Sequence, residues 1–196
     1  GIVRVPQAGR HIVLDALAAL AVGEELGVPF DILQEHLASF PGADRRFQMR
    51  GEVAGIRVVD DYGHHPTEIS ATFDTARRMT GDGRLVVLFQ PHRYTRMAAL
   101  MDGFARALAL ADLVLVSDIY AANEAPIPGV TGEVLAQKIG RFGQARAHFC
   151  PRVEDMPTAV LPLLQPGDLV LTLGAGNITA AGPKLLDLLK REGHGP

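Results

Sequence analysis

The amino-acid sequence predicts an α/β protein with a mostly parallel, doubly wound (Rossmann-like) sheet, an initial β-hairpin, and two helices before the hairpin. Three observations support this fold class. Continuous apolar runs such as Leu85–Phe89 and Leu169–Leu173 are typical of strands buried on both faces. Helical segments alternate with these runs, which favours parallel strands joined by right-handed crossovers. A change of pattern near Asp44 separates this region from a helical beginning.

Residues 1–43 are predicted to be helical. An alanine- and leucine-rich helix is expected over 12–23, with Gly27 as its C-terminal cap. A second helix follows Pro29 and has apolar residues three and four positions apart, until Pro41 and Gly42 end it. Because two helices alone make a poor core, we expect this segment to belong to a larger unit.

Residues 44–196 are predicted to form the sheet domain. Ala54 and Gly55 indicate a two-residue turn between strand-like runs at 47–53 and 56–59. The other strands are expected at 85–89, 113–116, 148–149 and 169–173, and the helices at 67–79, 97–109, 132–139, 153–164 and 178–190.

Composition and charge limit the classes of function. A formal net charge of −3 provides no global basic field, which argues against a nucleic-acid partner. Apolar runs stay below the roughly 18 residues of a membrane helix, so no membrane partner is expected. The single cysteine, Cys150, excludes an internal disulfide and a cysteine-built zinc site, and this suits a cytoplasmic protein. The beginning at Gly1, without methionine, indicates a fragment or a processed chain.

Chemically versatile residues collect in loops expected at the carboxyl ends of strands, where doubly wound sheets bind ligands. Tyr62 and His64 follow the second strand, and His92, Arg93 and Arg96 follow the third. Guanidinium groups bind carboxylate or phosphate with two hydrogen bonds, and imidazoles orient or deprotonate amines near neutral pH. Both loops together predict an anion-binding and proton-handling site, although a helix cap or solvated surface explains either loop alone equally well.

Other features are less specific. Gly174-Ala175-Gly176 resembles the start of a dinucleotide fingerprint, but tight packing of a helix on a strand explains the glycines and is favoured. Arg46 either reaches a phosphate across a cleft or is a surface residue, and Glu124 is expected at the surface or as a helix cap. The sequence has no G-x-x-x-x-G-K-[ST], so a Walker loop would have to come from outside these residues.

Five stretches resemble the Mur ligases of peptidoglycan synthesis, in particular those that join L-alanine to UDP-N-acetylmuramate. They are Asp60-Asp61-Tyr62-Gly63-His64-His65-Pro66-Thr67-Glu68, Phe89-Gln90-Pro91-His92-Arg93-Tyr94-Thr95-Arg96, Asp44-Arg45-Arg46-Phe47-Gln48, Pro126-Ile127-Pro128-Gly129-Val130 and Gly174-Ala175-Gly176-Asn177-Ile178. The likeness places the tail of a central ATPase domain in 1–43 and the complete C-terminal domain in 44–196. It implies ATP-dependent amide formation through an acyl phosphate. It also implies Mg²⁺ bound mainly by the central domain, and N-terminal and central domains as partners.

The resemblance also implies roles for individual residues. The L-alanine end of the site would be formed by Tyr62, His64, His92, Arg93 and Arg96, with the arginines gripping the carboxylate. The cofactor-binding residues would be His11, Asp15, Arg46 at the ATP phosphates and Asp61 near the ribose.

The adenine-facing helix departs from the family pattern. Family members usually have His-Asn-x-x-Asn where this chain has His11-Ile12-Val13-Leu14-Asp15. The Ile12 side chain forms no hydrogen bonds, and an ionised Asp15 only accepts them. This departure motivates one alternative, a non-catalytic or divergent binding module of the same fold. A separate alternative is a ligase of the same superfamily for another amino acid, such as glycine or serine. We expect the isolated chain to fold without ligase activity.

Overall fold

The computed structural model describes residues 1–7 and 9–192, and within them it forms a six-stranded sheet in the order β1-β2-β6-β3-β4-β5. The strands are β1 (Gln48–Val53), β2 (Ile56–Asp61), β3 (Leu85–Phe89), β4 (Leu113–Val116), β5 (Arg146–Phe149) and β6 (Leu169–Leu173). β1 runs antiparallel to β2, and the other neighbouring strands are parallel. The predicted fold class, a mostly parallel sheet with an initial hairpin, is confirmed.

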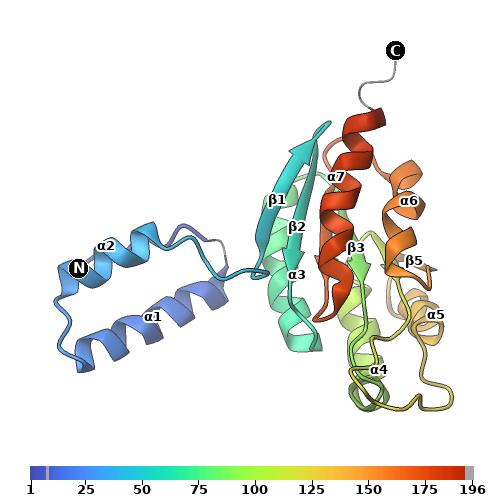
Figure 1. Cartoon of the computed structure of the whole chain (residues 1–196), viewed down its shortest axis with the longest axis horizontal. Coiled ribbons are helices and arrows are strands. Elements are labelled where there is room, and N and C mark those ends of the chain that lie inside the picture. Colours follow the sequence, from blue (N-terminus) through green and yellow to red (C-terminus); the bar gives the residue numbers. More distant parts are fainter. Residues whose placement is uncertain (8, 193–196) are drawn as a thin grey trace.

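Helices cover both faces of the sheet (Figure 1). One face carries α3 (Pro66–Thr80), α4 (Tyr94–Leu108) and α5 (Gly132–Phe142), and the other carries α6 (Met156–Val160) and α7 (Ala181–Glu192). Alternate strand residues enter the two cores: Val87 and Phe89 belong to the first, Val86 and Leu88 to the second. Both faces of the central strands are therefore buried, which explains why β3 and β4 are apolar at every position.

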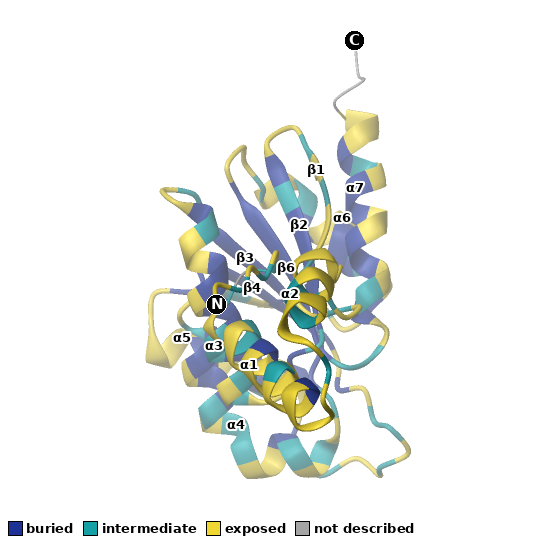
Figure 2. Ribbon diagram, turned by 90° about the vertical axis from the view of Figure 1, so that its left-hand side faces the viewer, coloured by how far each residue is buried: buried dark blue, intermediate teal, exposed yellow. Residues whose placement is uncertain are grey.

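The first two helices form a separate hairpin that projects away from the sheet (Figure 1). They are α1 (Arg10–Glu25) and α2 (Phe30–Ser39), and most of their surface is exposed (Figure 2). Within the pair only Ala16 and Gly23 are buried. A Cβ at Gly23 would lie 2.5 Å from a methyl carbon of Leu33, so glycine permits the close approach of the two helices. Among the described helices, none is long and apolar enough to cross a membrane.

The β1–β2 hairpin has the expected two-residue turn. Ala54 and Gly55 both adopt positive φ angles, of 51° and 75°, as in the turns that match the twist of paired strands. A bulge interrupts the pairing between Met49 and Gly51, and the φ of Gly51 is 155°. β2 continues to Asp61, two residues further than predicted.

Several element boundaries differ from the predicted ones. The helix expected over 153–164 is divided into the 3₁₀ turn Val153–Asp155, α6, and the 3₁₀ turn Leu161–Leu163, because Pro157 and Pro162 supply no backbone donors. Another 3₁₀ turn, Asn177–Ala180, precedes α7. β5 begins two residues earlier than predicted, and α4 begins three residues earlier.

Candidate functional site

Four loops lie side by side at the carboxyl edge of the sheet. In the strand register Asp61 is opposite Leu173, Leu173 is opposite Phe89, and Phe89 is opposite Val116. The loops that follow β2, β6, β3 and β4 therefore start at the same level. This is the edge where a doubly wound sheet places its ligand crevice.

Four aromatic rings from three of these loops form a row. The ring centroids of Tyr62 and His64 are 5.2 Å apart, and those of His64 and His92 are 6.1 Å apart. The His92 ring stacks on Tyr120, with centroids 5.4 Å apart and an interplanar angle of 6°. Tyr120 was not among the predicted site residues, although its place after the fourth strand was a usable signal.

Backbone hydrogen bonds join the loops after β3 and β4 at the stacked residues His92 and Tyr120. The Tyr120 N–H donates to the carbonyl of Pro91 at 2.8 Å, and the Arg93 N–H donates to the carbonyl of Tyr120 at 2.9 Å. Arg93 has a φ of 70°, a left-handed conformation that is uncommon for a side chain of this size. The two loops are therefore held together immediately before α4 begins.

The predicted arginines lie beside His92. Arg96 Nη1 donates to His92 Nδ1 at 3.3 Å, and the Arg93 side chain is exposed close by. Burial lowers the pKa of His92 below 6.5, and the charges of Arg96, His64 and Arg93 lower it further. Two cationic groups and a neutral imidazole are thus presented at one edge of the molecule.

Glu124 caps the helix that carries Arg96. Its carboxylate accepts from the Thr95 N–H at 2.9 Å and from the Thr95 hydroxyl at 2.7 Å. These hydrogen bonds, together with the charge of Arg93, lower the pKa of Glu124. Arg93, the N-cap residue, makes no side-chain cap of its own, so Glu124 takes the cap role that was one of its two expected roles.

A capping box at the start of α3 positions His64. Glu68 accepts from the backbone N–H groups of His64 and His65, at 2.9 and 3.2 Å. His65 Nδ1 accepts from the Thr67 N–H at 3.3 Å. Because His65 provides the helix cap, the side chain of His64 is left for other contacts, one of which is Nδ1 at 3.0 Å from the carbonyl oxygen of Tyr62.

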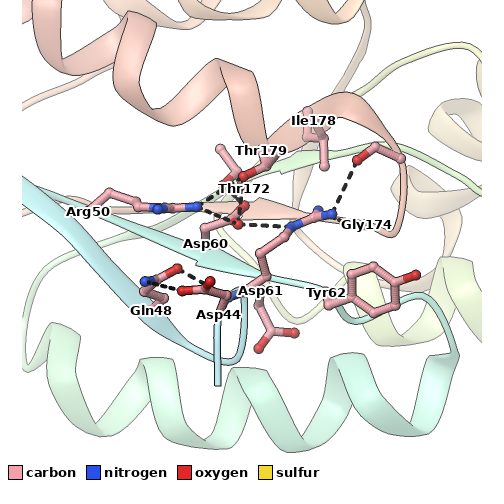
Figure 3. A network of polar contacts seen from close by, with 12 residues as sticks. Asp44, Gln48, Arg50, Asp60, Asp61, Tyr62, Thr172, Gly174, Ile178 and Thr179 are labelled. Atoms are coloured by element: carbon pink, nitrogen blue, oxygen red, sulfur yellow. Dashed lines mark hydrogen bonds and ion pairs between the residues drawn. The ribbon is translucent and has the colours of Figure 1, made fainter. Parts of the chain in front are cut away.

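A buried carboxylate connects the junction segment, residues 40–47 between α2 and β1, to the sheet (Figure 3). Asp60 is fully buried, and its Oδ2 accepts from Arg45 Nε at 3.1 Å, Thr179 Oγ1 at 2.9 Å and Arg50 Nη2 at 3.4 Å. Its Oδ1 accepts from Thr172 Oγ1 at 2.6 Å. Residues from β1, β2, β6 and the turn before α7 are therefore joined at one charged group.

The two adjacent arginines at the junction have different surroundings. Arg45 donates to the carbonyl oxygens of Gly174 and Gly176 as well as to Asp60. Its guanidinium carbon lies 5.0 Å from the centroid of the Tyr62 ring, so this side chain is part of the structural framework. The Arg46 guanidinium lies 5.8 Å from the same ring, and the residue is exposed.

Arg46 lines a cavity of about 370 Å³ between the helical hairpin and the junction segment. His11, Ile12 and Asp15 line the same cavity, beside apolar residues of both helices. The structure thus brings together three of the four predicted cofactor-binding residues.

Asp61, the fourth, does not line this cavity. It is buried, and its carboxylate accepts from the N–H groups of Gly63 and Phe47, each at 2.8 Å, and from the Thr72 hydroxyl at 3.2 Å. Its role near a ribose stays a prediction.

The glycines after β6 allow a close approach of two loops. Gly174 has a φ of 142°, and a Cβ there would lie 2.6 Å from the carbonyl oxygen of Gln90. The Gln90 side chain then donates to Asn177 Oδ1 at 2.7 Å and accepts from the Ile178 N–H at 3.1 Å. The sequence favoured tight packing of a helix on a strand as the reason for these glycines; at Gly174 the close approach is instead to the loop after β3.

Comparison with known proteins identifies the family. The profile described as "Mur ligase, glutamate ligase domain" matches residues 45–176. The chain belongs to the Mur ligase family. This Mur ligase chain is 54% identical over 187 residues to UDP-N-acetylmuramate–L-alanine ligase of Solibacter usitatus, covering 95% of the chain and 39% of that protein. It is 50% identical over 191 residues to the protein of the same name from Syntrophobacter fumaroxidans, covering 97% and 40%.

A solved structure resembles this Mur ligase chain over almost its whole length. The crystal structure of the UDP-N-acetylmuramate–alanine ligase of Thermotoga maritima superposes with a TM-score of 0.80 at 27% identity, covering 97% of this chain and 40% of that one. The chain therefore spans about 40% of the length of the relatives that it matches.

Proposed function

We propose that this chain forms the amino-acid end of an ATP-dependent ligase that joins L-alanine to UDP-N-acetylmuramate in peptidoglycan synthesis. The observation that carries the proposal is the meeting of His64, His92, Arg93 and Arg96 at one sheet edge. Relatives at 50–54% identity bear the name of this activity, which supports the choice of substrates.

In the proposed reaction the muramyl carboxylate first becomes an acyl phosphate, and the amine of L-alanine then attacks its carbonyl carbon. Arg93 and Arg96 bind the alanine carboxylate, because guanidinium groups match carboxylates in charge and geometry. The imidazoles of His64 and His92 lie beside this carboxylate site, where the amine is placed. Positioning of two reactants in this way lowers a barrier by about 7 kcal/mol in favourable cases.

ATP, which supplies the phosphoryl group, would bind in the cavity between the helical hairpin and the junction segment. His11, Ile12 and Asp15 would surround the base, and Arg46 would meet the phosphates. Mg²⁺ would be bound mainly by the central domain of the full-length enzyme, where it would neutralise charge on the phosphates of ATP.

The organisation of the whole enzyme follows from the same proposal. Residues 1–43 would be the tail of the central ATPase domain and 44–196 the C-terminal domain. The N-terminal and central domains of the same enzyme would be the partners of this chain. We place the enzyme in the cytoplasm, where UDP-linked substrates and ATP are available.

The proposal is tested with Arg93→Ala and Arg96→Ala in the full-length ligase that contains this segment. Loss of a hydrogen bond to a charged group costs about 1.5–3 kcal/mol, so the KM for L-alanine should rise roughly 10- to 100-fold. The KM for ATP should stay the same. Arg106→Ala is the matched control, because Arg106 lies on the same helix but over the ring of Phe142. An unchanged alanine KM in both site variants would refute the carboxylate role.

Two further measurements separate this proposal from its alternatives. A panel of L-alanine, glycine and L-serine measures which amino acid the full-length enzyme uses. The purified 196-residue chain should fold and show no ligase turnover. A full-length protein that binds the substrates without ATP turnover would instead support the non-catalytic module. This alternative is considered because Ile12 and Asp15 line the cavity in place of the usual asparagines.

A further inference from the structure

We propose that the two histidines have opposite proton roles: His64 accepts a proton from the ammonium group of the incoming amino acid, and His92 donates a hydrogen bond. The inference rests on the proposed function and deepens it, because an ammonium group has no lone pair and must lose a proton before it attacks a carbonyl carbon. The assignment comes from the partners of the two Nδ1 atoms.

His64 has its proton on Nδ1. The atom next to Nδ1, at 3.0 Å, is the carbonyl oxygen of Tyr62, and a carbonyl oxygen only accepts hydrogen bonds. A neutral His64 must therefore donate from Nδ1, which leaves the lone pair of Nε2 free to take a proton. Glu68 Oε2, 3.5 Å from Nδ1, then lies beside the imidazolium that forms and stabilises it.

His92 has its proton on the opposite nitrogen. Its Nδ1 lies 3.3 Å from a guanidinium nitrogen of Arg96, and a guanidinium only donates. A neutral His92 must accept at Nδ1 and carry its proton on Nε2, so that Nε2 is a donor. The burial and cationic neighbours that lower the pKa of His92 keep it neutral, and the stacked Tyr120 ring fixes its plane.

The charged and titratable groups around His64 are compatible with its role as a general base, which becomes positively charged when it accepts a proton. Glu68 on α3 is the carboxylate in contact with it, and His92 faces it from the loop after β3 as a neutral ring. The ring of Tyr62 contacts the His64 ring in an edge-to-face arrangement. The guanidinium group of Arg46 lies 5.8 Å from the centroid of the Tyr62 ring. His64 is thus the histidine of the pair that has both a free lone pair and an adjacent carboxylate.

The proposed step balances in atoms and charge. One ammonium proton moves to Nε2 of His64, the amine forms the C–N bond with the acyl carbon, and the C–O bond to the phosphate breaks. A second nitrogen proton leaves with the phosphate as HPO₄²⁻, and the amide keeps the third. His92 donates from Nε2 to the carboxylate or to the oxygen that becomes negative during attack.

The test compares two nucleophiles in the full-length ligase. L-Alanine must be deprotonated, whereas hydroxylamine is already uncharged near neutral pH and traps the acyl phosphate as a hydroxamate. His64→Gln should lower kcat with L-alanine by about 10²- to 10⁴-fold, the usual contribution of a general base, and remove the acidic limb of the kcat profile against pH. Hydroxamate formation with ATP and UDP-N-acetylmuramate should stay near the wild-type rate.

Two more variants complete the comparison. His92→Gln keeps an N–H donor near the position of Nε2 and should retain more alanine activity than His64→Gln. His148→Gln, at an exposed position on β5, is the control and should match wild type in both reactions. Histidine ¹⁵N spectra of the full-length enzyme should show His64 protonated at Nδ1 and His92 protonated at Nε2.

The outcomes separate the two proposals. If wild-type enzyme makes no hydroxamate, the proposed function fails and this inference fails with it. If wild type makes hydroxamate but His64→Gln keeps its alanine rate and its acidic limb, only the proton role is overturned. Equal loss of both reactions in His64→Gln, or reversed tautomers in the spectra, would overturn it as well.

Discussion

Removal of the buried carboxylate of Asp60 should destabilise the chain strongly. Asp60→Ala leaves two guanidinium groups and two threonine hydroxyls without their shared acceptor. Breaking a buried ion pair from one side costs about 3–5 kcal/mol. The side chains of Arg45 and Arg50 are 19% and 29% exposed, so water partly replaces the lost partner, and we expect about 3 kcal/mol. This is a large part of the usual total of about 5–15 kcal/mol.

Urea unfolding of the 196-residue chain measures this loss, followed by circular dichroism because the sequence contains no tryptophan. Asp155→Ala is the matched control, since Asp155 pairs with Arg152 at the surface, and it should leave the midpoint nearly unchanged. A loss below about 1 kcal/mol for Asp60→Ala would show that the network adds no more than an exposed pair does.

Three further predictions follow from local geometry. Gly132→Ala would place a Cβ 1.9 Å from the backbone oxygen of Ser117 and should lower the free energy of unfolding by about 1–3 kcal/mol. Gly140→Ala, on the same helix, meets open space and should raise it by about 0.5–1 kcal/mol. Thermal unfolding that ranks the two variants in the opposite order would contradict this. NMR titration should show a pKa of His92 below 6.5. Because the folded chain binds this proton more weakly than the unfolded chain does, the contribution of His92 to stability is lost as the pH falls from 6.5 through the lowered pKa. A titration midpoint at or above 6.5 would contradict this. Glu124→Ala in the full-length ligase should raise the KM for L-alanine and not that for ATP, since it uncaps the helix at Thr95; equal changes in both constants would argue against it.

The central strands were predictable because their environment is uniform. Apart from Thr172, which bonds to Asp60, each residue of 85–89, 113–116 and 169–173 faces one of two cores. Apolar character therefore marks these strands to the residue. β5 was harder to define, because its positions alternate between exposed and half-buried at the edge of the sheet. The predicted second strand ends before Asp60 and Asp61, because the sequence does not reveal that arginines, threonines and backbone N–H groups satisfy two buried carboxylates.

The sequence predicts which loops form the candidate site, but it does not predict which side chains contact each other there. Strand order places the loops with His64 and His92 at one edge, and this follows from parallel strands alone. The stacking of Tyr120 on His92 and the cap that Glu124 gives to α4 depend on the path of the loop 117–131. That path includes positive φ angles at Ala122 and Asn123, which no pattern in the sequence predicts.

The bulge in β1 has a consequence for how the chain behaves at high concentration. An outer strand with free N–H and C=O groups invites a second molecule to add its own strand. The bulge next to Gly51 disturbs the regular spacing of these groups, and the charged Arg50 and Glu52 flank it. At the opposite border Arg146 and His148 are exposed. We therefore expect this sheet to resist edge-to-edge aggregation.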